Sequence, residues 1–99
     1  MPNMLIKVKL FASIRERVGT RIVELKVSEG ATLYELLGEL VKAYPKALKG
    51  YLINEAGEVN EELNFLVNGI NASSLEGLKT KLKDGDAVSI LPPVSGGIR

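Results

Sequence analysis

The chain has 99 residues, 45% of them hydrophobic and 25% charged, with a net charge of +1 at pH 7. This length fits one domain, and the near-neutral charge gives no general attraction to nucleic acid. Because there is no cysteine and no histidine, the sequence excludes disulfides, thiolate nucleophiles, histidine-based triads and a zinc site.

The N-terminal half predicts two paired strands. The segment MLIKVKLFA alternates, with Ile6, Val8 and Leu10 on one face, and RIVELKV alternates in the same way. Joined by SIRERVG, which is turn-rich or helical, they are predicted to form a hairpin. Lysines interrupt the first apolar run, which is also too short for a signal or membrane segment, so a cytoplasmic protein without a membrane partner is expected.

The next segment predicts the one long helix, over residues 32–44. Thr32 and Glu35 have the spacing of a capping box, in which each side chain satisfies a free backbone donor of the first turn. Apolar residues then recur at three- and four-residue spacing up to Pro45. Gly38 lies inside this helix at a cost of about 1 kcal/mol relative to alanine, so we expect a close packing contact there to compensate.

The C-terminal half predicts short strands and a tail. LNFLV is a candidate buried strand, Asn68-Gly69 is a tight-turn signal, and AVSIL is a last strand that Pro92 ends. This order predicts an α+β fold, with one helix on one face of a mixed sheet and the first and last strands parallel at its centre. Residues 1–91 would form the domain and residues 92–99 a flexible tail.

Two segments closely resemble a known family. LFASIRERVGT near the start and LKDGDAVSILPPVSGG at the end are similar to the small subunit of molybdopterin synthase, a ubiquitin-like sulfur carrier. The resemblance spans essentially the whole chain and implies the β-grasp fold. It also implies a non-catalytic carrier subunit, in agreement with the lack of any acid, base and nucleophile constellation in the sequence.

The resemblance implies a defined chemistry for the tail. A ubiquitin-activating-like enzyme would use ATP to adenylate the carboxylate of the second glycine, Gly97. Sulfur transfer would then give a thiocarboxylate, and the large subunit of the synthase would take up the tail to build molybdopterin. No permanently bound cofactor is implied, since the ATP belongs to the activating enzyme.

Other functions remain open on the sequence alone. Sulfur carriers for thiamine synthesis or tRNA thiolation, and archaeal ubiquitin-like modifiers, share the fold and the Gly-Gly end. A modifier would form isopeptide bonds through Gly97. A plain binding module with an inert tail is the remaining alternative.

The residue types of the tail fit insertion into a partner. Prolines favour an extended chain, and glycines lack a Cβ, so an enclosing site can close tightly around them. Residues 92–97 can span on the order of 20 Å. The predicted tail contacts with the partner are Pro92, Pro93, Val94 and Ser95, with Gly96 and Gly97 at the reacting end.

The chain departs from the family pattern by continuing past Gly97 with Ile98 and Arg99. Ile98 is β-branched and Arg99 is bulky and charged, so both would clash with a channel closed around glycines. We therefore expect a processing protease to cut after Gly97. The alternative is that the two extra residues are tolerated.

A docking surface is predicted near the tail. If alternation holds, Leu91 and Phe11 lie on the outer face of the sheet, where exposed apolar side chains commonly mark a partner site. Ile70, after the tight turn, is expected to join them, and Arg15 to pair with a carboxylate of the partner. The alternative places Phe11 in the core through a strand bulge.

Overall fold

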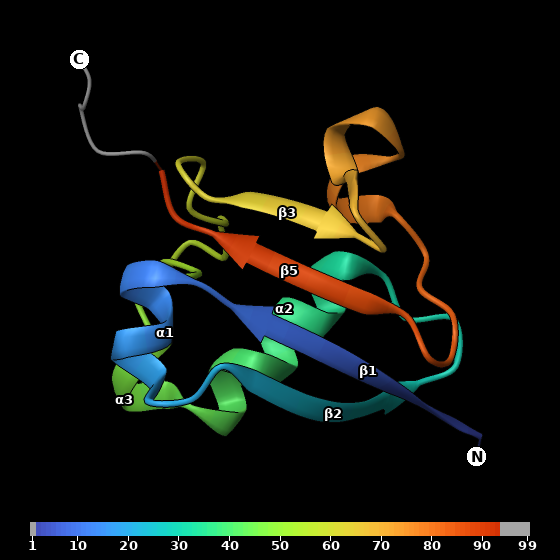
Figure 1. The fold of residues 1–99 in the computed structure, drawn as a ribbon, viewed down its shortest axis with the longest axis horizontal. Coiled ribbons are helices and arrows are strands. Elements are labelled where there is room, and N and C mark those ends of the chain that lie inside the picture. The colour runs from blue at the N-terminus through green and yellow to red at the C-terminus, as the bar shows by residue number, and fades with distance from the viewer. Residues whose placement is uncertain (1, 94–99) are drawn as a thin grey trace.

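The computed structural model describes residues 2–93, which form a five-stranded mixed sheet in the order β2-β1-β5-β3-β4 (Figure 1). The strands are β1 Asn3–Leu10, β2 Ile22–Ser28, β3 Asn64–Val67, β4 Ile70–Asn71 and β5 Ala87–Leu91. The helices are α1 Ala12–Val18, α2 Leu33–Ala43 and α3 Pro45–Leu48, and two 3₁₀ turns, η1 Ala72–Ser74 and η2 Gly77–Lys79, precede β5.

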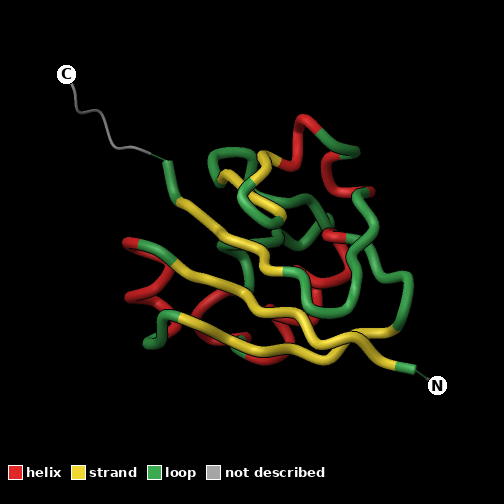
Figure 2. The backbone as a smooth tube through the Cα atoms, turned by 45° about the vertical axis from the view of Figure 1, so that its right-hand side comes forward, coloured by secondary structure: helices red, strands yellow, loops and turns green. Residues whose placement is uncertain are grey.

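The pairing of the strands confirms the predicted topology. β1 pairs antiparallel with β2 and parallel with β5, and β5 pairs antiparallel with β3. The two most apolar strands therefore lie parallel at the centre of the sheet. With α2 packed across one face (Figures 1 and 2), this is the predicted α+β, β-grasp architecture. Among residues 2–93, no helix is long and apolar enough to cross a membrane.

The capping box predicted for α2 is present. The backbone N–H of Glu35 donates to Thr32 Oγ1 at 3.2 Å, and the N–H of Thr32 donates to Glu35 Oε1 at 2.9 Å. The helix begins at Leu33 and ends at Ala43, before Pro45 opens α3. The predicted helix is confirmed to within one residue at each end.

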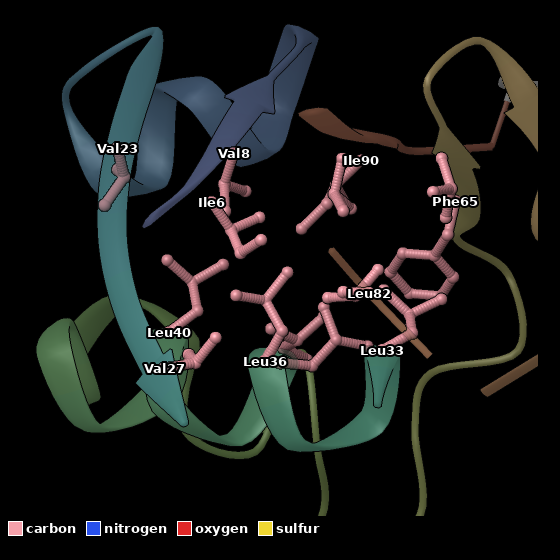
Figure 3. Close-up of a cluster of buried hydrophobic side chains, with 14 of the residues drawn as sticks. Ile6, Val8, Val23, Val27, Leu33, Leu36, Leu40, Phe65, Leu82 and Ile90 are labelled. Atoms are coloured by element: carbon pink, nitrogen blue, oxygen red, sulfur yellow. The ribbon is translucent and has the colours of Figure 1, made fainter. Parts of the chain in front are cut away.

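Alternation in the strands and helical spacing in α2 converge on one core (Figure 3). The even-numbered residues of β1 from Met4 to Leu10 are buried, as are Val88 and Ile90 in β5. Full burial of each such side chain stabilises the fold by about 1.5–3 kcal/mol before entropy is counted. The α2 side chains that meet them are Leu33, Leu36, Leu37 and Leu40, each 0% exposed.

The expectation for Gly38 is wrong. Apart from its chain neighbours and the backbone of its own helix, a Cβ added at this position meets no heavy atom within 4 Å, and the backbone does not have a positive φ. Neither close packing nor backbone conformation requires a glycine here. The helix therefore carries the intrinsic cost of glycine with no compensating contact in the described structure.

The Asn68-Gly69 turn is confirmed as a two-residue hairpin between β3 and β4. Both residues have positive φ, 52° and 84°, as a type I′ turn requires. The Asn68 side chain also donates to Asp86 Oδ1 at 2.9 Å and accepts the N–H of Ala87 at 2.9 Å. The turn is thereby tied to the entry of β5.

The D-G-D segment before β5 has a structural role. Asp84 accepts the N–H of Leu5 at 2.7 Å, and Asp86 accepts the N–H of Lys83 at 2.8 Å. Gly85, at φ +88°, donates its N–H to the carbonyl of Leu5 at 2.9 Å. These bonds hold the start of β5 beside β1.

Candidate functional site

The candidate site lies where the two central strands end. Because β1 and β5 are parallel with Leu10 opposite Ile90, their C-terminal ends lie at one border of the sheet. Phe11 and Leu91 each follow by one residue, so the register makes them neighbours. Figure 1 shows this border, with the start of α1 close to the end of β5.

Phe11 is on the surface. Its backbone is extended (φ −128°, ψ 151°), so the alternation of β1 continues past the buried Leu10 and turns Phe11 outward. The side chain is 39% exposed. Ala12, at φ +50°, then bends the chain into α1. The structure places Phe11 outside the core, against the bulge alternative.

Leu91 also lies on the outer face of the sheet, by the alternation of side chains along β5. Val88 and Ile90 are 0% exposed and face the helix, so alternation directs Leu91 to the outer face. It is half-buried and pairs across the sheet with Asn64. Beyond it, Pro92 is half-buried and Pro93 is exposed. The described chain therefore leaves the sheet directly beside Phe11.

A shallow hollow of about 300 Å³ opens next to Phe11. Residues of β1, α1 and the start of β2 line it: Lys9, Leu10, Phe11, Arg15, Arg21 and Ile22. Its lining contains three cations and no carboxylate. We call these six residues the cationic hollow. Such a surface suits an apolar side chain of a partner flanked by carboxylates.

Four of the six residues of the cationic hollow were not predicted as site residues from the sequence: Lys9, Leu10, Arg21 and Ile22. Ile22 is 47% exposed and pairs with Lys9, and the carbonyl of Arg21 accepts the N–H of Leu10 at 2.7 Å. Ile22 lies on the face opposite Val23, as the alternation of a strand requires. What the pattern could not supply was the register that sets Ile22 beside Lys9.

Ile70 is not part of this cluster. It is 51% exposed in β4 and pairs with Val67, which is opposite Val88 on β5. Directly opposed residues share a face, so Ile70 is on the helix-bearing side. It is also near the end of the sheet away from Leu91. The structure therefore separates Ile70 from Phe11 and Leu91.

The reacting end of the tail is outside the described residues. Val94, Ser95, Gly96 and Gly97 belong to this part, as do Ile98 and Arg99. Within residues 2–93, no group of three or more acidic side chains is placed to hold a metal ion.

Comparison with known proteins identifies relatives over nearly the whole chain. A profile of the ThiS family matches residues 8–97. Small archaeal modifier protein 3 of Haloferax volcanii is 43% identical over 94 residues, covering 95% of this chain and 100% of that protein. The molybdopterin synthase sulfur carrier subunit of Chlamydomonas reinhardtii is 34% identical over 94 residues, with the same coverage.

The fold is also similar to a solved structure. The solution structure of small archaeal modifier protein 1 from Methanosarcina acetivorans superposes with a TM-score of 0.83 at 40% identity. The alignment covers 98% of this chain and 100% of that one.

Proposed function

Because the chain belongs to the ThiS family of ubiquitin-like sulfur carriers, we propose that it carries sulfur on the carboxyl group of Gly97 and delivers it to the large subunit of molybdopterin synthase. The 34% identity to a synthase carrier subunit over that protein's full length supports this assignment.

The observation that carries the proposal is the convergence at the border of the sheet. Phe11 and Leu91 lie beside the point from which Pro92 and Pro93 leave, and the rest of the cationic hollow extends from Phe11 toward β2. A partner that seats an apolar anchor there is correctly placed to receive the following residues. Binding at this surface would then position Gly97 without any active-site residue on the carrier itself.

The proposed chemistry needs an activating enzyme with ATP, because a carboxylate is a poor electrophile. One carboxylate oxygen of Gly97 attacks the α-phosphorus of ATP, and pyrophosphate leaves. A hydrosulfide-equivalent nucleophile then attacks the carbonyl carbon of the acyl-adenylate, and AMP leaves with the bonding electrons. The product is a thiocarboxylate, formed without a change of oxidation state at carbon.

A modifier function is the second candidate, favoured by the 43% identity to small archaeal modifier protein 3. It uses the same adenylate, but a lysine amine of another protein attacks the carbonyl carbon. The two functions therefore differ in the nucleophile and share the docking and activation steps.

Both functions require a free carboxyl group on Gly97, so we propose that a protease removes Ile98 and Arg99. The match to the family profile ends at residue 97, which supports this position for the cut. An uncut chain would place the activated carbon two residues beyond the site prepared for it, and a displacement of even about 1 Å can cost on the order of a hundredfold in rate.

The test is adenylation by the cognate activating enzyme, followed as ATP-dependent pyrophosphate release. Residues 1–97 should react, residues 1–96 should react poorly, and residues 1–99 should react only after trimming, as checked by intact mass. Adding sulfide and then the synthase large subunit with its substrate should give molybdopterin. Equal rates for 1–97 and untrimmed 1–99 would refute the processing step.

Failure of all three chains to react would refute the carrier and the modifier functions together. Reaction of 1–97 with transfer to lysines of other proteins, but not to the synthase, would favour the modifier.

A further inference from the structure

One border of the sheet is an open strand edge that exposes Glu24 and Lys26. β2 pairs with β1 on one side, and among residues 2–93 no strand pairs with it on the other (Figure 1). Free strand edges offer backbone donors and acceptors to a further strand. We propose that β2 is a self-association edge, at which two copies of this chain pair antiparallel about a two-fold axis through Leu25.

The backbone groups that are free on β2 follow from its pairing with β1. The N–H of Leu10 bonds the carbonyl of Arg21 directly opposite, and the N–H of Glu29 bonds the carbonyl of Pro2 directly opposite. Since hydrogen-bonded pairs alternate along an antiparallel ladder, the odd-numbered residues of β2 bond to β1. The residues whose backbone groups point to the open edge are therefore Ile22, Glu24, Lys26 and Ser28.

A two-fold axis at Leu25 makes the exposed side chains of this edge complementary. Glu24 of each copy then lies directly opposite Lys26 of the other, and Ile22 lies opposite Ser28. All four side chains are exposed on the outer face of the sheet. The pairing gives two Glu–Lys contacts across the strands and about four backbone hydrogen bonds between Glu24 and Lys26 of the two copies. The carbonyls of Ile22 and Ser28 already accept hydrogen bonds from Thr20 Oγ1 and the N–H of Ala31, so the outer pairs add less.

The neighbouring registers are unfavourable. The two-fold axis can pass only through a residue position, because only then do the edge-facing backbone groups of the two copies lie opposite each other. An axis at Glu24 sets two glutamates opposite each other, and an axis at Lys26 sets two lysines opposite each other. Like charges directly opposite destabilise a strand pair. The charges of β2 therefore favour the Leu25 register over the two adjacent two-fold registers.

The other face of the edge supports the same register. Leu25 is half-buried and packs at the margin of the core, whereas Val23 and Val27 are nearly covered. Across the axis, the two Leu25 residues form a non-hydrogen-bonded pair, in which side chains approach most closely. The remaining exposed part of this leucine is thus covered by its copy.

The dimer would be a continuous ten-stranded sheet with both tails free. β2 starts at the border where β1 and β5 end, since Ile22 pairs with Lys9. Antiparallel pairing therefore places the two tail exits at opposite ends of the shared edge, separated along it by about 20 Å or more. The tail exits are outside the strand pair, and the interface is isologous and closed. Ile22 belongs both to this edge and to the cationic hollow, so self-association and docking of the large subunit share this residue.

The test is a charge reversal at the edge, measured by sedimentation equilibrium of the full chain. One strand pair is a small interface, so we expect wild type to associate weakly, between about 10 µM and 1 mM, from 10.7 kDa toward twice that mass. E24K and K26E should each weaken association at least about tenfold. The double variant E24K/K26E restores opposite charges across the axis and should associate within about threefold of wild type.

Controls separate this edge from other surfaces. K79E makes the same charge change as K26E at an exposed position in η2 and should leave association unchanged. Circular dichroism melts establish that each variant is folded. In amide hydrogen exchange, Glu24 and Lys26 should become protected as wild-type concentration rises. A monomer at 1 mM, a double variant as weak as the single ones, or exchange at these amides independent of concentration would overturn the proposal.

Discussion

At the scale of the residue, Phe11 is the most informative side chain, because it is exposed beside the tail exit without filling the core. Phe11→Asp should weaken binding to the synthase large subunit at least about tenfold, since truncating a central aromatic anchor typically costs 2 kcal/mol or more. Isothermal titration calorimetry with residues 1–97 measures this. The melting temperature should change by less than about 4 °C.

Leu75 provides the matched control for Phe11. It is an apolar residue of similar exposure, 42% against 39%, between η1 and η2 and away from the tail exit. Leu75→Asp should leave binding unchanged. Equal losses for the two variants, or a large fall in the melting temperature of Phe11→Asp, would show that Phe11 has no special contact with the partner.

Substitution of Gly38 is expected to raise the stability of the fold. An added methyl group enters open space in α2, so Gly38→Ala should stabilise the fold by about 1 kcal/mol. This corresponds to a rise of about 4–8 °C in the melting temperature of a domain of this size. Thermal unfolding followed by circular dichroism measures it. An unchanged or lower melting temperature would contradict the structure around Gly38.

At the scale of the element, the start of α2 depends on its capping box. Thr32→Ala removes the acceptor for the N–H of Glu35 and should destabilise the protein by about 1 kcal/mol. Urea unfolding should show a lower midpoint with an unchanged slope. Thr32→Ser keeps the acceptor and serves as the control. Equal midpoints for Thr32→Ala and wild type would show that the cap contributes nothing.

The elements differ in how far the sequence predicts them. α2 and the central strands follow from apolar periodicity and local caps, and they are confirmed. The neighbours of Ile70 and Ile22 could not be predicted from the sequence. They depend on strand register, which local sequence patterns do not determine. The cationic hollow combines β1, α1 and β2, so no single segment of sequence contains it.

At the scale of the whole molecule, the charges that matter for docking are local. The chain has a net charge of +1, yet the cationic hollow contains three cations beside the tail exit. We expect binding to the large subunit to weaken as salt is raised from about 50 to 500 mM, mainly through a slower association rate. Arg21→Glu should flatten this dependence, whereas Lys79→Glu should not. A binding rate independent of salt would contradict the docking surface.

The most direct test of the central claim is the intact mass of the protein isolated from its own cells. The account predicts a species that ends at Gly97, with one carboxyl oxygen replaced by sulfur, and its loss when the activating enzyme is deleted. Gly97 joined to lysines of other proteins would assign the shared activation chemistry to the modifier function instead. A chain that keeps Ile98 and Arg99, with an unmodified carboxyl group and no conjugates in cells that make molybdopterin, would contradict the account.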